Sequence, residues 1–252
     1  MSKPVFVLLH GAWHTPKCWD RLVSELDKAG YESVAPALPS SNASPLPLDW
    51  SADLDLIRTT VLELVVDRDV VVVTHSFSGM TGGTALERLD KQSCAARGLK
   101  GGVVRVVHIN AFLVSEGFQH SPRGTRDNMI PEMKTDFEAG TVTVLPEDIK
   151  EMFHQDLDDE ISREYGHDLR PHSLGTYWCA TTYAAWRHIP TSYIFCTKDR
   201  PGTVAAIHYL ISSAKSSGMH KIDNVVEVES GHSPFLSRPQ WTAETLIAEA
   251  NR

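Results

Sequence analysis

The chain has 252 residues, 42% of them hydrophobic, which is enough to bury the core of one α/β domain that carries an insertion. Its formal net charge of -8 argues against nucleic acid or an anionic membrane as the main partner, because both attract basic surfaces. The four cysteines form no C-x-x-C pair, and the chain shows no secretory signal and no apolar run long enough to span a membrane. We therefore expect free thiols and a cytoplasmic location.

Apolar runs alternate with helical periodicity along most of the chain. Val5–Leu9 is an apolar run that predicts a buried strand, and it opens onto a loop with the sequence HGAWH. Further strands are expected at 32–35, at the four valines 70–73, and at 103–109, 192–197 and 225–228. Helices are expected at 19–30, 54–65, 79–89, 204–213 and 241–250. This alternation predicts a mostly parallel central sheet with helices on both faces.

The valine run ends in a sharp turn that resembles a nucleophile elbow, in which a serine stands clear of the sheet between a strand and a helix. Ser76 would occupy the apex. The usual pattern is G-x-S-x-G, and here Thr74 and Ser78 replace the two glycines. Ser78 is the rival nucleophile, but it would place Met80 where a small side chain is needed. The pattern therefore favours Ser76.

The segment 113–189 breaks the alternation. Prolines and glycines divide it into short pieces, which predicts a cap inserted into a core formed by 1–112 and 190–252. Its aromatic side chains either pack the cap onto the core or contact the substrate. As candidates for substrate contact we take two residues of the first loop and two of the cap: Trp13, His14, Tyr183 and Trp186.

Three candidate catalytic residues follow predicted strands in the order nucleophile, acid, histidine. Ser76, Asp199 and His232 would meet at the carboxyl edge of the sheet, where sites of open α/β sheets gather. A serine hydroxyl needs a base to remove its proton, and the histidine needs a carboxylate to fix its tautomer. Glu116, just beyond the strand at 103–109, is the rival acid.

An oxyanion formed by acyl transfer would need hydrogen-bond donors close to the serine. The backbone N–H of Phe77, directly after the nucleophile, is one candidate. The second is the backbone N–H of Ala12, with that of Trp13 as the alternative.

The segments 10–14, 74–79, 196–201 and 231–236 together resemble the α/β-hydrolase superfamily, and are most similar to small esterases related to plant methylesterases and hydroxynitrile lyases. The resemblance implies an α/β-hydrolase fold with an inserted cap and no cofactor or metal. It also implies that Ser76 is the nucleophile, Asp199 the acid and His232 the base, with the oxyanion donors on Ala12 and Phe77.

These features predict a serine hydrolase that cleaves a carboxylic ester or lactone of a modest-sized, partly apolar small molecule through an acyl-enzyme. A hydroxynitrile lyase is less favoured, because those lyases have threonine where this chain has Gly11 and lysine where it has Ser233. Carbon–carbon bond hydrolysis or lysis, a biosynthetic acyl transfer, and a ligand receptor on the same fold stay open as alternatives. The sequence also leaves a homodimer open.

Overall fold

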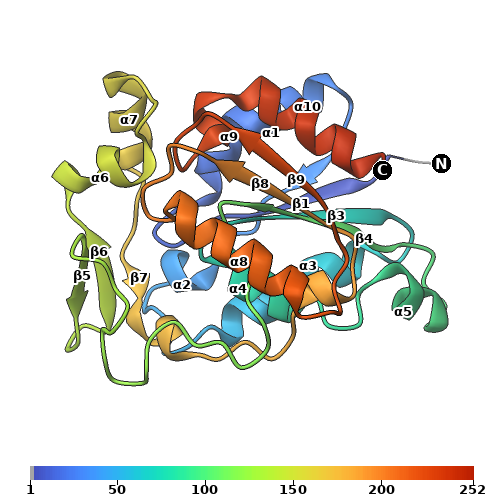
Figure 1. Cartoon of the computed structure of the whole chain (residues 1–252), viewed down its shortest axis with the longest axis horizontal. Helices are drawn as coiled ribbons and strands as arrows, with labels where there is room; N and C mark the ends of the chain where they lie inside the picture. The colour runs from blue at the N-terminus through green and yellow to red at the C-terminus, as the bar shows by residue number, and fades with distance from the viewer. Residues whose placement is uncertain (1–2) are drawn as a thin grey trace.

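A parallel β-sheet forms the centre of the protein, and the computed structural model describes residues 3–252. The sheet has six strands in the order β2-β1-β3-β4-β8-β9, and each neighbouring pair is parallel (Figure 1). The strands are β1 Val5–Leu9, β2 Ser33–Val34, β3 Asp69–His75, β4 Gly102–Ile109, β8 Thr191–Cys196 and β9 Ile222–Val228. The predicted parallel sheet is confirmed.

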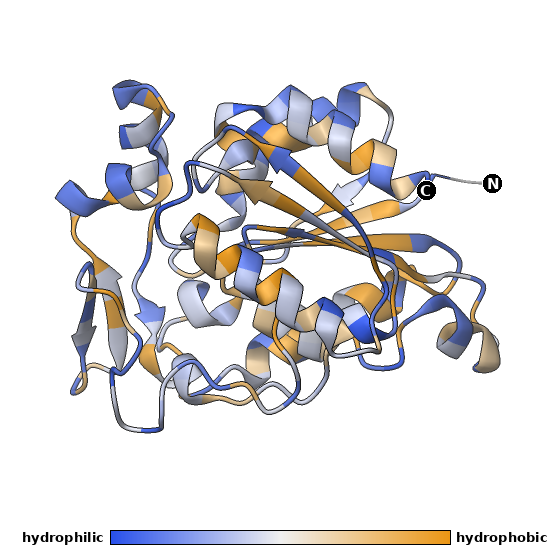
Figure 2. Cartoon of the chain, viewed as in Figure 1, coloured by the Kyte–Doolittle hydropathy of each residue, from blue (hydrophilic) through white to orange (hydrophobic). Residues whose placement is uncertain are grey.

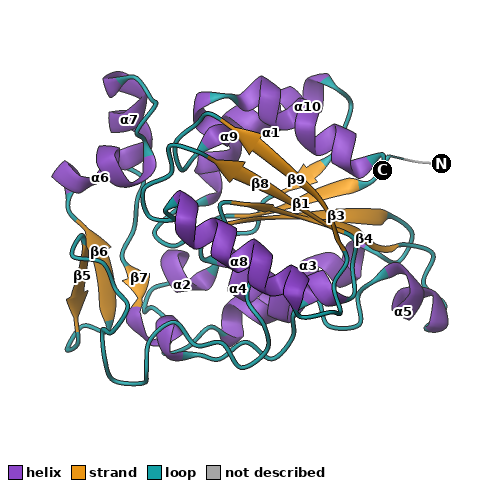
Figure 3. Cartoon of the chain, viewed as in Figure 1, coloured by secondary structure: helices purple, strands orange, loops and turns teal. Residues whose placement is uncertain are grey.

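Helices cover both faces of this sheet (Figure 3). On one face lie α1 (Asp20–Lys28) and α10 (Pro239–Ala250), and on the other lie α3 (Ser51–Leu64), α4 (Ser78–Ala85) and α8 (Val204–Ser216). Successive side chains of a strand point to opposite faces, so Phe6 and Leu8 of β1 pack toward α1 and α10. Val7 and Leu9 of the same strand pack toward α3.

Strand β3 has a continuous apolar sequence because both of its faces are covered. Its valines at 70–73 are each 0% exposed, and the hydropathy colouring shows the apolar residues concentrated in the central strands (Figure 2). Burying one such side chain stabilises the fold by about 1.5–3 kcal/mol. The same burial fixes the position of the turn that follows the strand.

The edges of the fold depart from the predicted boundaries. β9 begins at Ile222 rather than 225, because it is an edge strand on which polar residues such as Asp223 are exposed and resemble a loop in sequence. Short helices that carry too few residues for a periodic pattern were not predicted. They are α2 Pro39–Asn42, α5 Lys91–Ala96 and α9 Pro234–Ser237, with the 3₁₀ helices η1 Pro16–Trp19, η2 Leu174–Trp178 and η3 Ala185–Arg187.

Between β4 and β8 the chain leaves the main sheet and forms a small antiparallel one. Its strands are β5 Met133–Asp136, β6 Thr141–Val144 and β7 His172–Ser173. Two helices accompany them, α6 Pro146–Phe153 and α7 Asp159–Gly166. These strands and helices stand beside the ends of β8 and β9 at which their arrows point (Figure 1). No helix within residues 3–252 is long and apolar enough to cross a membrane.

Candidate active site

Ser76 occupies a strained turn between β3 and α4. Its φ is +54°, in the left-handed region that non-glycine residues rarely adopt. Backbone packs closely around this turn. A Cβ added to Gly11 would lie 3.0 Å from the Ser76 Cβ, and one added to Gly79 would lie 2.2 Å from the carbonyl oxygen of Phe112. Glycine is therefore required at position 79, and the fit at Gly11 is tight.

Neighbouring groups accommodate Thr74 and Ser78, the two residues that replace the glycines of the usual elbow sequence. Ser78 is fully buried, and its Oγ accepts the His75 N–H at 2.9 Å and lies 2.8 Å from the Leu9 carbonyl oxygen. The Thr74 methyl group lies against Gly82, where an added Cβ would be 2.8 Å away. Thus Ser78 hydrogen-bonds within the turn, and Gly82 makes room for the larger Thr74.

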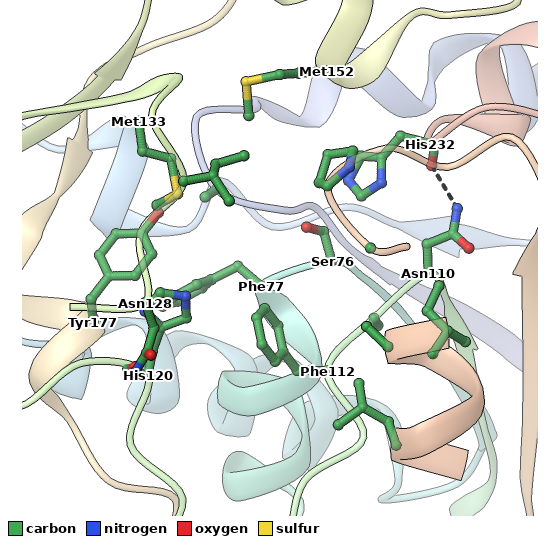
Figure 4. Close-up of a pocket in the computed structure, with 18 of the residues that line it drawn as sticks. Ser76, Phe77, Asn110, Phe112, His120, Asn128, Met133, Met152, Tyr177 and His232 are labelled. Atoms are coloured by element: carbon green, nitrogen blue, oxygen red, sulfur yellow. Dashed lines mark hydrogen bonds between the residues drawn. The ribbon is translucent and has the colours of Figure 1, made fainter. Parts of the chain in front are cut away.

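Asp199 and His232 form a buried hydrogen-bonded pair. Asp199 Oδ1 lies 2.9 Å from His232 Nδ1, and the two side chains are 0% and 2% exposed. Backbone bonds between the loops after β8 and β9 bring them together, since Lys198 N donates to Ser230 O at 3.0 Å. His232 Nε2 is buried without a hydrogen-bond partner among residues 3–252. Ser76 and His232 border the same pocket (Figure 4).

The rival acid Glu116 lies elsewhere. Its carboxylate accepts a hydrogen bond from Arg187 Nε at 3.1 Å and one from the Ala184 N–H at 3.3 Å. The side chain is 39% exposed and makes no contact with His232 that would compete with Asp199. The structure therefore brings Asp199, and not Glu116, to the histidine.

Asn110 is a site residue that the sequence alone did not single out. It directly follows β4, has φ +43°, and lines the cavity beside His232. Its Oδ1 accepts the Cys196 N–H at 2.9 Å, while its Nδ2 donates to the His232 carbonyl oxygen at 3.3 Å (Figure 4). Asn110 thus ties the strand before Asp199 to the loop of His232. A polar residue directly after a strand was the available signal.

Two backbone amides next to Ser76 are unpaired. The N–H groups of Ala12 and Phe77 donate no hydrogen bond within the described part of the chain, and both residues line the cavity. The alternative donor, the Trp13 N–H, is already bonded to Ser41 Oγ at 3.1 Å. The geometry therefore favours Ala12 over Trp13.

A cavity of about 470 Å³ opens beside Ser76. Of the four residues expected to contact substrate, Trp13 lines it, and its indole N–H donates to Val142 O at 2.9 Å. His14 does not line it: the ring is buried behind the first loop, with Nδ1 2.8 Å from the Ala12 carbonyl oxygen.

The two cap candidates do not line the cavity either. Tyr183 stacks on His188 with ring centroids 4.8 Å apart and packs toward α4. Trp186 donates its indole N–H to Val114 O at 2.9 Å and packs with the apolar side chains under α8. Both hold the segment onto the main sheet.

The cavity wall carries no ionised lysine, arginine, aspartate or glutamate within the described residues. Buried histidines surround the site, and desolvation lowers the pKa of His10 to about 4 and those of His14 and His172 to about 3. These rings are therefore neutral at pH 7. No cluster of three or more His, Cys, Asp or Glu side chains that could hold a metal ion occurs in residues 3–252.

A family model described as the alpha/beta hydrolase family matches residues 6–245. The chain belongs to this family. The resemblance to it is confirmed, and this chain matches relatives over nearly their whole length. The chain is 28% identical to "Alpha/beta hydrolase nvfD" of Aspergillus novofumigatus, over 98% of this chain and 96% of that protein. It is 22% identical to "Alpha-hydroxynitrile lyase" of Arabidopsis thaliana, over 97% of this chain and 96% of that protein.

Solved structures share the fold. Polyneuridine aldehyde esterase superposes with a TM-score of 0.77 at 20% identity, covering 98% of this chain and 99% of that one. The methylesterase MES16 from Arabidopsis superposes with a TM-score of 0.74 at 21% identity, with the same coverage. At these identities the likeness concerns the fold alone.

Proposed function

We propose that the protein is a serine hydrolase that cleaves a carboxylic ester or lactone of a modest-sized, partly apolar substrate. One observation carries this proposal: His232, whose Nδ1 is hydrogen-bonded to the buried Asp199, borders the same cavity as Ser76, which a strained turn presents next to two unpaired amides. Membership of the alpha/beta hydrolase family supports hydrolytic chemistry.

In this mechanism Ser76 Oγ attacks the ester carbonyl carbon while His232 Nε2 takes the hydroxyl proton. Asp199 accepts the Nδ1–H and stabilises the imidazolium that forms. The Ala12 and Phe77 amides donate to the oxyanion, each worth on the order of 3 kcal/mol. Collapse of the tetrahedral intermediate breaks the ester C–O bond, and His232 returns the proton to the leaving alkoxide. Water, activated by His232, then hydrolyses the acyl-enzyme.

We propose further that residues 113–189 act as a cap that selects the substrate. Much of the cavity wall opposite the main sheet comes from this segment, including Phe118, Met133 and Phe153. A mostly apolar wall with a few polar groups fits a partly apolar ester.

The hydroxynitrile lyase alternative receives no support from the local geometry. The residue after His232 is a fully buried serine, Ser233, so this position offers no ammonium group to a departing anion.

Turnover of a short-chain nitrophenyl ester tests the proposal, together with covalent labelling by a serine-directed phosphonate. Ser76→Ala should abolish both, with an unchanged thermal midpoint. Ser78→Ala is the matched control: it should keep the labelling but lower the thermal midpoint, because an unsatisfied buried polar group costs about 1–3 kcal/mol. Activity that survives in Ser76→Ala and is lost in Ser78→Ala would assign the nucleophile to Ser78. Absence of turnover and labelling in the unaltered protein would favour a receptor.

A further inference from the structure

Tyr177 places an unpaired hydroxyl group in the cavity wall. The residue lies in η2 and is 2% exposed, and its ring is fixed edge-on against Phe77 and His172 at centroid distances of 5.0 and 5.4 Å. The hydroxyl is buried and has no hydrogen-bond partner among residues 3–252. Desolvation raises the Tyr177 pKa well above its usual range, so the group is a neutral donor. A buried unpaired hydroxyl is costly, and a ligand oxygen would satisfy it.

His120 offers the complementary acceptor beside it, with ring centroids 5.1 Å apart. Ser121 Oγ donates its only proton to the Asp127 carbonyl oxygen, so it can only accept from His120 Nδ1, which lies 3.0 Å away. His120 therefore carries its proton on Nδ1, and Nε2 presents a lone pair that no hydrogen bond within residues 3–252 uses. Burial lowers the His120 pKa to about 4, which keeps the ring neutral at pH 7.

A hydrogen bond from Asn128 holds the backbone of His120 in place. Asn128 Nδ2 donates to the His120 carbonyl oxygen at 2.8 Å, and Asn128 also lines the cavity. Tyr177, His120 and Asn128 gather on one side of the pocket, across from His232 and Asn110, with Ser76 between the two groups (Figure 4). The pair is thus separate from the groups that would carry out ester cleavage.

We propose that Tyr177 and His120 form a second subsite that binds an alcohol hydroxyl of the substrate, so that the substrate class is a neutral hydroxy ester or hydroxy lactone. The substrate hydroxyl accepts a hydrogen bond from Tyr177 and donates one to His120 Nε2. This inference rests on the proposed ester hydrolysis and specifies its substrate.

The chemistry of the wall distinguishes a hydroxyl from other oxygen groups. A ketone or an ether can accept from Tyr177 but leaves His120 Nε2 unpaired. A carboxylate or an ammonium group would enter a cavity whose described lining holds no opposite charge. A site built to pair with a hydroxyl discriminates strongly against analogues that lack it, because its own polar groups are then left unsatisfied.

Methyl esters of straight-chain acids test the subsite, compared as plain, oxo and hydroxy forms with the oxygen moved stepwise along the chain. We expect at least one hydroxy ester to exceed both its plain and its oxo counterpart by tenfold or more in kcat/KM. In Tyr177→Phe the ratio of hydroxy to plain ester should fall at least tenfold, and in His120→Phe the ratio of hydroxy to oxo ester should fall. Tyr193→Phe is the matched control, because the Tyr193 hydroxyl already donates to Ala111 O at 2.8 Å; it should keep both ratios.

Calorimetric binding of the same esters to Ser76→Ala separates this inference from the proposed function. Preferential binding of a hydroxy ester, lost on adding Tyr177→Phe, supports the subsite even when the unaltered protein hydrolyses none of the esters. Hydrolysis without any preference for a hydroxy ester would overturn the subsite and leave the hydrolase standing. A preference for an oxo ester that depends on Tyr177 but not on His120 would also overturn the assignment to a hydroxyl.

Discussion

Asp199 makes its contact with His232 through one carboxylate oxygen. Oδ1 lies 2.9 Å from His232 Nδ1, whereas Oδ2 is buried without a partner within residues 3–252. Glu116, in contrast, is paired with Arg187. If the pair acts as proposed, the negative charge of Asp199 stabilises the imidazolium formed during catalysis.

Asp199→Asn should lower kcat by several orders of magnitude, since an amide keeps the shape but removes this charge; the corresponding change in a serine protease costs about 10⁴-fold. Glu116→Gln should change kcat by less than about threefold, because only a half-exposed ion pair with Arg187 is weakened. Steady-state kinetics on a nitrophenyl ester measures both. A larger loss in Glu116→Gln than in Asp199→Asn would move the acid to Glu116.

At the scale of residues, the sequence predicted where the candidate catalytic residues lie better than it predicted which way the aromatic side chains point. Ser76, Asp199 and His232 could be selected because each follows a recognisable strand, and the ends of parallel strands share one edge. For aromatic residues no such rule applies. Residue type cannot distinguish Trp186, whose indole bonds to Val114 O, from an aromatic side chain that faces the cavity.

At the scale of elements, the segment between β4 and β8 contributes much of the cavity wall. Met133 of β5 and Met152 of α6 both line it and are buried, at 6% and 3% exposed. Methionine is flexible and fills irregular space, so we expect these two side chains to limit the length of acyl chain that the cavity accepts.

Met133→Ala should shift the preference toward longer acyl chains, because the lost side chain enlarges the cavity next to the substrate. It should also cost about 2–5 kcal/mol of stability, the usual range for truncating a buried methionine. Relative kcat/KM values along a series of nitrophenyl esters measure the shift. Met219→Ala, at a residue that is 64% exposed, is the control and should leave the series unchanged. An unshifted chain-length profile in Met133→Ala would mean that β5 does not limit the substrate.

The strands of the two sheets differ in how far the sequence could predict them. The buried strands β1, β3 and β4 were recognisable because burial on both faces requires continuous apolar runs. The strands β5–β7 alternate or are very short, and their pairing joins Thr141 to Ser173 across a long stretch of chain. Such pairing depends on tertiary contacts that no local pattern records.

At the scale of the whole molecule, many histidine rings are buried in neutral form. Burial lowers the pKa of His10 and His154 to about 4 and those of His14, His108 and His172 to about 3. Asp53 acts in the opposite direction, because burial raises its pKa to about 6 and its folded form retains a proton longer than the unfolded one. These histidines outnumber Asp53, so they should dominate the change in folding stability as the pH falls.

We therefore expect the thermal midpoint to fall steeply as the pH drops from 6.5 toward 4. Above pH 6.5 a histidine is neutral in both the folded and the unfolded state. Below pH 6.5 the unfolded chain binds a proton while the buried ring of the folded protein stays neutral, so the free energy of unfolding falls until the pH reaches the folded pKa. At pH 5, a ring with a folded pKa near 3, such as His108, lowers the free energy of unfolding by about 2 kcal/mol.

His108→Gln should give a smaller difference in thermal midpoint between pH 7 and pH 5 than the unaltered protein shows. His208→Gln, at an exposed position on α8, should follow the unaltered curve. Calorimetric melts across this range measure the effect, and parallel curves for His108→Gln and the unaltered protein would remove His108 from the account.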